Sequence, residues 1–530
     1  MYKNKYLTFI VFLFILVIGL IVYKDYNIYG DEFFHQYAGS IYYLHLKETL
    51  LNLDFNNIHF HEIQRLLKNV HMSPWFIYPM FFELLTEFVI DIFSFEASKE
   101  IFEIRHLTNF IIFYISLIFF FKILSERFKN NYLAILGILI LFFTPRFFAE
   151  SFYNSKDLLF MSFTIIHLYF SNKFINYLTI KNLFYFSITA GILINIRVYG
   201  IIFPLISFFF IFIESIENKK KLLKNIKLSL ISILLIIFTI YIFWPFLWTS
   251  PIKNFLVYAE WLSSAYKFLI PNVYLGEVIY SNQVPWHFVL VWILITMPLV
   301  IILFCIFGLY LLSRKFFNNL LKIDTTNKLW LNNLEKTDFF VFISILFFLL
   351  LALTSHTIHG GWRYFYFLYP FMIYISLIFL ENIKSIKGGI YSFSIFCIIM
   401  NLLLNVDWIF KNHPNQNYYF NPIKKYFIKK NFDVDYWGLS ERQALYFILE
   451  NDKKKILKVS SIGKTWIAGS FIMLEPNLKK RLKHVEPNDA DYILDRGVTG
   501  NKKIDLKNFK NYNEFTIDGN IVYTIYKRVK

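Results

Sequence analysis

The chain of 530 residues is 57% hydrophobic and only 17% charged, and its mean hydropathy is +0.47. An ordinary soluble domain carries roughly 25% charged residues, so this composition excludes both a single water-soluble core and intrinsic disorder. The formal net charge of +17 would suggest a nucleic-acid partner in a soluble protein. In a membrane protein, cytoplasmic loops and headgroup contacts account for the same excess, so we expect membrane lipids and no nucleic acid as partners.

The apolar runs predict a mainly α-helical, polytopic membrane protein. A spanning helix needs about 20 apolar residues. The first run, at 6–23, is too long for a signal peptide and lacks a small-residue cleavage site, so we expect an uncleaved first helix. Further runs lie at 107–124, 132–144, 158–170, 183–195, 198–213, 228–247, 287–312, 339–354, 364–380 and 390–404, which makes about eleven spans.

The distribution of basic residues predicts which ends of these helices face the cytoplasm. The connectors at 122–130, 214–227 and 313–337 are rich in Lys and Arg, which predicts that they face the cytoplasm. With eleven spans, the N-terminus is expected inside and the C-terminus outside. The segment 24–106 then forms a long external loop, in which acidic residues interrupt the aromatic stretch 75–95 and favour a helix lying at the membrane interface.

The composition changes near residue 406. Residues 406–530 are polar and basic, with strand-like pieces at 456–460 and 515–526. We therefore expect a transmembrane domain over 1–405 and a small α/β domain outside the membrane over 406–530. The two cysteines, Cys305 and Cys397, lie inside apolar runs and offer neither a disulfide framework nor a zinc site.

Two adjacent carboxylates, Asp31 and Glu32, follow the first predicted span, with His35 close behind. Paired carboxylates can act as a general base, bind a metal, or raise each other's pKa. The alternative is that these are solvated acidic residues of a loop beside a membrane helix.

The next short external loop, 144–157, concentrates charge between apolar runs. It holds Arg146, Glu150, Lys156 and Asp157, at a depth where unpaired charge is costly. These residues could form a site or an internal network of ion pairs such as Arg146–Glu150 or Lys156–Asp157.

Two further loops carry arginine. Arg197 separates two apolar runs, and Arg363 follows Gly360-Gly361 and precedes Tyr364. A guanidinium group binds phosphate through two parallel hydrogen bonds, and a glycine pair lets the backbone approach a ligand. The alternative for Arg363 is a side chain that reaches the lipid headgroups. His356 and His359 are spaced for a metal, but without an adjacent carboxylate a solvated loop is favoured.

Together these loops bring acids from two segments and arginines from three to the predicted outer face. A transferase whose donor carries a lipid-linked phosphate needs such a set, because carboxylates activate an acceptor hydroxyl or amine and cations hold the leaving phosphate.

Six segments, in order along the chain, carry a resemblance to a known family. The sequence resembles the bacterial multi-pass glycosyltransferases of the C-type fold, which are related to protein O-mannosyltransferases and the lipid A aminoarabinose transferase. The segments are Asp31-Glu32; His71-Met72-Ser73-Pro74; Pro145-Arg146 with Asn154-Ser155-Lys156-Asp157; Gly276 with Pro285-Trp286-His287; Trp362-Arg363-Tyr364 with Tyr369-Pro370; and His413-Pro414 with Asp435-Tyr436-Trp437-Gly438.

The resemblance implies transfer of a sugar, with inversion, from a polyprenyl-phosphate donor to an extracytoplasmic lipid, glycan or protein, in a bacterial inner membrane. It implies that Asp31 is the general base, supported by Glu32, and that Asp157 positions the acceptor or a metal. The family is divided on metal use, so a divalent ion stays open and no other cofactor is expected. The donor phosphate would be held by Arg146, Lys156, Arg197 and Arg363, and substrate contacts would come from His35, His359 and Tyr364. Asp433 and Asp435 could instead be catalytic, although a structural or acceptor-facing role is favoured in a soluble tail.

Two other classes of function stay open. An oligosaccharide ligase or polymerase of the envelope usually relies on a large external loop with Arg and His, whereas the loop near 246–286 has only Lys253 and Lys267 as bases, which argues against this class. A lipid or ion transporter tends to place charge inside its spans and to show internal repeats, and neither is found in this sequence.

Overall fold

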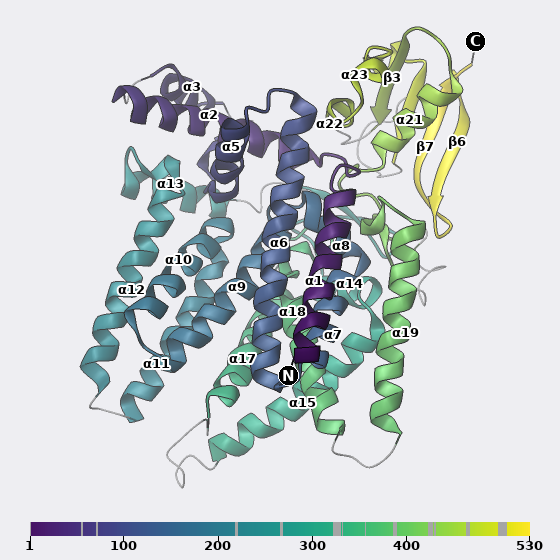
Figure 1. The fold of residues 1–530 in the computed structure, drawn as a ribbon. Helices are drawn as coiled ribbons and strands as arrows, with labels where there is room; N and C mark the ends of the chain where they lie inside the picture. Colours follow the sequence, from purple (N-terminus) through teal and green to yellow (C-terminus); the bar gives the residue numbers. More distant parts are fainter. Residues whose placement is uncertain are drawn as a thin grey trace.

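The computed structural model has a helical bundle with a small sheet at one end (Figure 1). It describes residues 2–54, 57–69, 73–217, 221–264, 269–321, 330, 332–355, 357–384, 389–421, 428, 431–462, 467–496 and 506–529.

Eight helices in the described ranges are long and apolar enough to cross a membrane, which confirms the polytopic, mainly α-helical class. The 3-10 turn η1 (Val198–Ile201) leads directly into one of them, α11. The eight helices are α1 (Tyr2–Val22), α6 (Ser98–Phe128), α9 (Asp157–Asn176), α11 (Ile202–Glu217), α12 (Leu222–Ile242), α15 (Leu299–Leu321), α17 (Asn333–Thr354) and α19 (Ile390–Lys411).

Shorter apolar helices account for the other predicted runs. α7 (Asn131–Phe142) and α8 (Pro145–Tyr153) form a pair bent by 69°, which makes nine spans if the pair is one. α10 (Ile180–Ile196) and α18 (Leu368–Ile383) are apolar but shorter than the eight. Each of the eleven predicted runs therefore contains a helix, although three of them fall short of a full span on their own.

The run 287–312 was expected as one helix, and this expectation is wrong. The structure divides it into α14 (Phe288–Thr296) and α15, with Met297 in an extended conformation between them. The physical reason is Pro298, because the residue before a proline is pushed out of the helical region. Trp292 of α14 contacts Phe420 and Phe432, which follow α19 in the chain.

Short helices and a hairpin cover the upper end of the bundle in Figure 1. The predicted stretch 75–95 forms two helices instead of one, and Glu83 and Glu87 of the second are buried where an interfacial helix would turn them to water. The elements at this end are α2 (Gly30–Asn52), α3 (Ile58–Leu67), α4 (Ser73–Ile77), α5 (Phe81–Phe93), η3 (Pro245–Leu247), α13 (Pro251–Ser263), β1 (Pro271–Tyr274), β2 (Glu277–Tyr280) and η5 (Arg363–Phe365).

The tail after α19 holds a five-stranded sheet at the same end, opposite to the N-terminus (Figure 1). The strand order is β4-β3-β5-β7-β6, with β3 parallel to both its neighbours and β7 antiparallel to β5 and β6. Its apolar core is separate from that of the bundle, and α19 continues through the predicted boundary at 405–406. The elements are η6 (Gln416–Tyr418), α21 (Glu441–Asn451), β3 (Leu457–Ile462), α22 (Ile467–Ile472), α23 (Pro476–Lys479), β4 (Leu482–His484), η8 (Pro487–Asp489), β5 (Tyr492–Asp495), β6 (Phe509–Ile517) and β7 (Asn520–Arg528).

Candidate active site

The turn between α8 and α9 positions Asp157. The side-chain Oδ1 of Asn154 accepts hydrogen bonds from the backbone N–H of Lys156 at 3.2 Å and of Asp157 at 2.8 Å. Its Nδ2 donates to Glu150 Oε2 at 2.6 Å and to Asp157 Oδ2 at 3.4 Å. These bonds hold the turn that precedes α9, whose N-cap is Lys156, so this segment determines where the Asp157 carboxylate lies.

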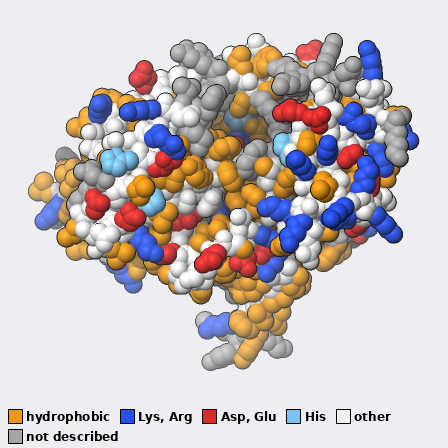
Figure 2. Space-filling view, turned by 90° about the horizontal axis from the view of Figure 1, so that it is seen from above, with side chains coloured by type: hydrophobic (Ala, Val, Ile, Leu, Met, Phe, Trp, Pro, Cys, Tyr) orange, Lys and Arg blue, Asp and Glu red, His pale blue; other side chains and the backbone are white. Residues whose placement is uncertain are grey.

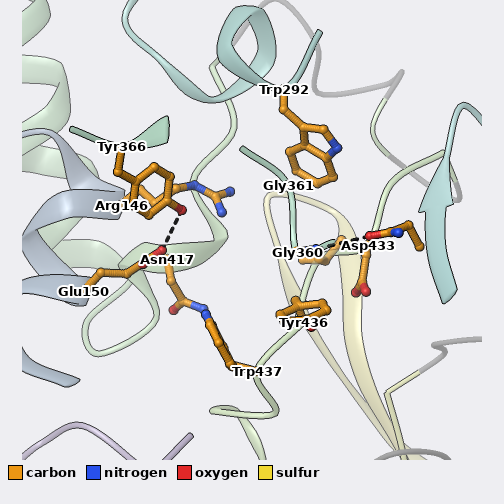
Figure 3. A pocket seen from close by; sticks show the side chains of 12 residues that line it. Arg146, Glu150, Trp292, Gly360, Gly361, Tyr366, Asn417, Asp433, Tyr436 and Trp437 are labelled. Carbon is orange, nitrogen blue, oxygen red and sulfur yellow. Dashed lines mark hydrogen bonds between the residues drawn. The ribbon is translucent and has the colours of Figure 1, made fainter. Parts of the chain in front are cut away.

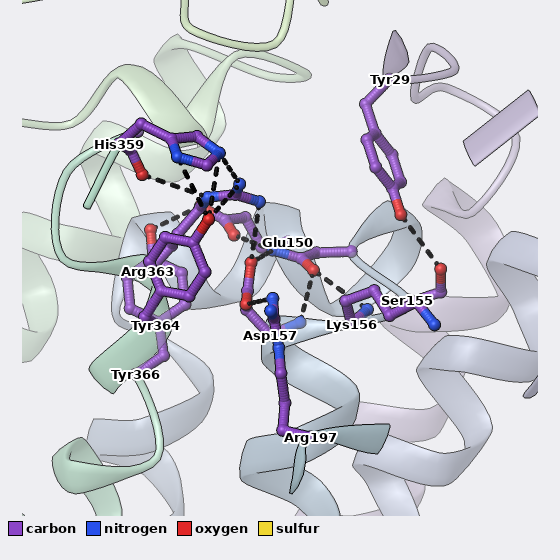
Figure 4. Close-up of polar contacts among 12 residues, drawn as sticks. Tyr29, Glu150, Ser155, Lys156, Asp157, Arg197, His359, Arg363, Tyr364 and Tyr366 are labelled. Carbon is purple, nitrogen blue, oxygen red and sulfur yellow. Dashed lines mark hydrogen bonds and ion pairs between the residues drawn. The ribbon is translucent and has the colours of Figure 1, made fainter. Parts of the chain in front are cut away.

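Asp157 holds two arginines from distant segments (Figure 4). Arg197, between α10 and η1, forms an ion pair with Oδ1, and Arg363, at the start of η5, donates through Nη1 to Oδ2 at 3.2 Å. Asp157 and Arg363 are only 3% and 6% exposed. One carboxylate cannot neutralise two guanidinium groups, so this trio keeps a net positive charge at a buried position.

Aromatic rings and a histidine surround Arg363. Its Nη2 lies 2.7 Å from His359 Nε2 and donates to the Tyr364 hydroxyl at 3.1 Å. The guanidinium carbon lies 4.6 Å from the ring centroid of Trp437 and 5.5 Å from that of Tyr436. A buried arginine with these contacts does not reach lipid headgroups, so that alternative for Arg363 is wrong.

Asp31 faces these cations without being paired to them. In the part of the chain that the structure describes, its carboxylate makes no hydrogen bond or ion pair. Burial raises the pKa of Asp31, Arg363 acts most strongly in the opposite direction, and Asp157, Arg197 and Lys156 have smaller effects. A carboxylate with a raised pKa and no partner beside cations fits the requirements of a general base.

Tyr29 ties the start of α2 to this cluster. Its hydroxyl lies 3.1 Å from Ser155 Oγ in the α8–α9 turn, and its ring centroid lies 4.6 Å from that of Trp437. Because Asp31 follows two residues later in the first turn of α2, these contacts hold it on the side of Asp157.

Comparison of the sequence with known protein families gives one match. Residues 78–244 match the family model of the dolichyl-phosphate-mannose-protein mannosyltransferases. The matched segment includes Asn154, Asp157 and Arg197, and it confirms the resemblance predicted from the motifs. The activity class that this mannosyltransferase family implies is a membrane glycosyltransferase of the C-type fold. No curated protein matches the chain.

Glu32 lies apart from Asp31 and Asp157. Its carboxylate is buried against α6, 3.6 Å from Arg105 Nε and 3.3 Å from His106 Nε2. Successive helical residues point about 100° apart, so two adjacent carboxylates in α2 face different neighbours. The structure therefore does not bring Glu32 together with Asp31.

Lys156 and His35 share a partner that the sequence did not reveal. Glu83 Oε1 lies 3.7 Å from Lys156 Nζ and 3.8 Å from His35 Nδ1. Burial lowers the pKa of Lys156, with Glu83 opposing it, and burial lowers the pKa of His35 well below its ordinary value. The predicted ion pair between Lys156 and Asp157 is absent among the described residues, because Asp157 is taken by the two arginines.

Arg146 lies at a separate small cavity, so the structure does not group it with Arg197 and Arg363. Its Nη2 donates to the backbone oxygen of Tyr419 at 3.2 Å. The expected Arg146–Glu150 ion pair is not among the ion pairs of the described residues; Glu150 instead accepts a hydrogen bond from the Tyr366 hydroxyl at 2.8 Å (Figure 3).

The donor groups for a metal are sparse. Among the described residues, no three His, Cys, Asp or Glu side chains lie close enough to hold an ion. Both oxygens of Asp157 face arginines, which leaves Asp31 as the unpaired carboxylate of the cluster. The set does not fit a metal centre. His71 and His356 lie outside the described residues.

The upper face of the molecule is hollowed near its centre. Figure 2 shows basic and histidine side chains at the base of this hollow and hydrophobic side chains along part of its border. A cationic base of this kind can bind an anionic group.

Proposed function

We propose that this protein transfers a sugar from a polyprenyl-phosphate donor to an acceptor outside the cytoplasm, with inversion at the sugar carbon. The observation that carries the proposal is the placement of Asp31, an unpaired carboxylate, beside the positively charged trio of Arg197, Asp157 and Arg363. The family match supports the class of reaction.

In the proposed step, Asp31 takes the proton from an acceptor hydroxyl or amine. The acceptor atom forms a bond to the sugar carbon from the face opposite the phosphate, and the bond from that carbon to the phosphate oxygen breaks. The electron pair leaves with the phosphate. Arg363 and Arg197 stabilise the charge that develops there, because fixed cations in a buried site need no reorganisation. Asp157 keeps both guanidinium groups in place.

The described parts of the basic connectors, at 122–130, 221–227, 313–321 and 332–337, lie at the end of the bundle away from this site (Figure 1), which supports an orientation with the N-terminus in the cytoplasm and the site and tail outside. We place the protein in a bacterial inner membrane on the strength of the resemblance. Protease added from the outside should cleave the tail in intact spheroplasts, and a protected tail would contradict the orientation.

The test of function compares a deletion strain that carries wild-type protein, Asp31→Asn or Asp25→Asn. Asp25 is the matched control, because it is an exposed acid that contacts His413 and lies outside the cluster. Mass spectrometry of envelope glycolipids and glycoproteins should show a sugar-sized mass lost on deletion, restored by wild type and Asp25→Asn, and not restored by Asp31→Asn. Full restoration by Asp31→Asn at equal membrane abundance would refute the role of Asp31. An unchanged glycan profile on deletion would favour a transporter or another class.

A further inference from the structure

The segment 435–440 of the tail folds into a turn around the carboxylate of Asp435. Its Oδ1 accepts hydrogen bonds from the backbone N–H of Gly438 at 2.8 Å and of Leu439 at 3.1 Å. Its Oδ2 accepts from the backbone N–H of Ser440 at 3.3 Å and from the Ser440 hydroxyl. An aspartate that accepts from the backbone a few residues further along the chain stabilises a tight turn, so this buried carboxylate gives the segment a defined shape.

Arg496 holds the turn from the side of the tail sheet. It directly follows β5, and its Nη1 donates to the backbone oxygens of Asp435 at 2.7 Å and of Tyr436 at 3.4 Å. Its Nε lies 3.5 Å from Oε1 of Glu441, at the start of α21. Burial lowers the pKa of this guanidinium, but the carboxylates of Glu441, Asp435 and Asp433 together raise it above its ordinary value. The buried guanidinium therefore stays charged and joins the sheet to the turn.

The turn presents two aromatic rings to the candidate site. The Arg363 guanidinium carbon lies 5.5 Å from the ring centroid of Tyr436 and 4.6 Å from that of Trp437. The Tyr436 ring also packs against Gly360, where a Cβ would lie only 2.9 Å from it (Figure 3). Because Arg496 binds the backbone oxygen of Tyr436 itself, it holds the backbone from which both rings reach Arg363.

We propose that Arg496 is a positioning residue that keeps Tyr436 and Trp437 against Arg363, so the tail sheet is part of the framework of the active site. The inference rests on the proposed function, in which Arg363 stabilises the leaving phosphate. A fixed cation does this only where its position is set before the reaction, and two rings against the guanidinium restrict its movement. The tail thereby affects donor binding, whichever acceptor the protein uses.

Two substitutions test this role in purified full-length protein, each with a matched control. Arg496→Gln removes the charge and the bonds to the turn. Its control is Arg481→Gln, since Arg481 also donates to backbone oxygens within the tail, those of Leu449 and Asp452.

The second substitution, Gly438→Ala, displaces the turn and leaves every charge in place, so it tests the role even if the loss of the guanidinium prevents folding. Gly438 has φ of +75°, and a Cβ there would lie 2.9 Å from Arg496 Nη1. Gly519, in the turn between β6 and β7, has φ of +76°, and a Cβ there meets no heavy atom of the described chain within 4 Å. Gly519→Ala therefore carries the same backbone strain without the contact.

The first readout is the fluorine NMR spectrum of protein labelled with fluorotryptophan. The chain has 11 tryptophans, and the resonance of Trp437 is the one that Trp437→Phe removes. We expect both test variants to shift or broaden this resonance and both controls to leave it in place. A loss of stability without displacement of the turn would not move it selectively.

The second readout is the dissociation constant of a short-chain polyprenyl phosphate. Arg496→Gln should raise it by about twofold to thirtyfold, the range for loss of a cation–π contact. Because Arg496 acts through the two rings, adding Arg496→Gln to the double variant Tyr436→Leu, Trp437→Leu should change it by less than about twofold. Effects that multiply would show that Arg496 acts by another route.

The inference is overturned if neither test variant moves the Trp437 resonance, if both bind polyprenyl phosphate as wild type does, or if the effects of Arg496→Gln and of the ring variants multiply. Failure of the proposed function looks different: wild type would not bind polyprenyl phosphate at all, and the resonance alone would then decide whether Arg496 positions the ring of Trp437.

Discussion

The guanidinium of Arg363 lies over the ring of Trp437, 4.6 Å from its centroid. Trp437 belongs to the segment that follows α19, whereas Arg363 lies between α17 and α18. The same tryptophan contacts Tyr29 at the start of α2. One side chain of the tail thus lies between the arginine of the site and the segment that carries Asp31.

The first prediction concerns this stacking. Replacing Trp437 with Leu removes a cation–π contact worth about 0.5–2 kcal/mol, so the donor KM should rise by about twofold to thirtyfold. Trp437→Phe keeps an aromatic face and should retain most of the affinity. Steady-state kinetics with purified protein checks both, and a Leu variant with the wild-type KM would show that the contact is only structural.

The second prediction separates charge from shape at Arg363. Lysine keeps the positive charge but cannot contact Asp157, His359 and Tyr364 at once, as the guanidinium does. Arg363→Lys should raise the donor KM about tenfold or more. Arg146→Lys, away from the trio, should raise it less, and the reverse ranking would move the phosphate site to the cavity.

The third prediction uses pH. Asp31 works as a base only when deprotonated, so activity should fall as the pH drops through its raised pKa. Arg363 lowers that pKa, so Arg363→Gln should move the acidic limb of the kcat/KM profile to higher pH, while Arg363→Lys should leave it nearly in place. An acidic limb that does not move in Arg363→Gln would exclude Asp31 as the titrating group.

The fourth prediction tests the turn that places Asp157. Asn154→Ala removes the oxygen that accepts from the backbone N–H groups of Lys156 and Asp157 and leaves Glu150 with one donor fewer, so we expect a loss of about 1–2 kcal/mol of stability together with lower activity. Asn154→Asp keeps this acceptor but adds a carboxylate beside Glu150 and Asp157. If both variants melt like wild type in detergent, the hydrogen bonds of Asn154 are not needed for the fold.

The fifth prediction concerns a variant that should lower the stability of the protein and leave its activity unchanged. Asp338 accepts from Arg127 at 2.6 and 2.9 Å and from the Tyr374 hydroxyl at 2.7 Å, at the end of the bundle away from the site. Asp338→Asn breaks this buried pair and should cost about 3 kcal/mol, seen as a lower melting midpoint. The donor KM at low temperature should not change, and a changed KM would reveal coupling between the two ends.

Hydropathy located the helices because the bilayer requires long apolar segments wherever the chain crosses it. It could not locate the break between α14 and α15, since Met297 and Pro298 do not interrupt the apolar run; only the backbone preference of Pro298 signals it. Nor could it show which side of α5 is buried. The sequence around Glu83 is the same whether this side chain faces water or Lys156, so the pattern cannot distinguish the two.

The sequence predicted which residues form the candidate site, but it did not predict which of them form ion pairs with each other. Asp31, Asp157, Arg197 and Arg363 stand out because charge beside apolar runs is costly. Sequence proximity favoured Lys156 as the partner of Asp157, but the structure pairs Asp157 with arginines from two later segments. Such pairings depend on how the helices pack, and the sequence alone does not show how close two residues far apart in the chain lie.

The tail is fastened to the α1–α2 junction by polar contacts. Arg442 donates to the backbone oxygens of Lys24, Asp25 and Tyr26, and Asn27 donates to Leu439 O and Ser470 Oγ. During synthesis, the segment that carries Asp31 is therefore made long before its partners in the tail. The ribosome must finish the tail before these contacts can form, so chains that stall after α19 would lack them.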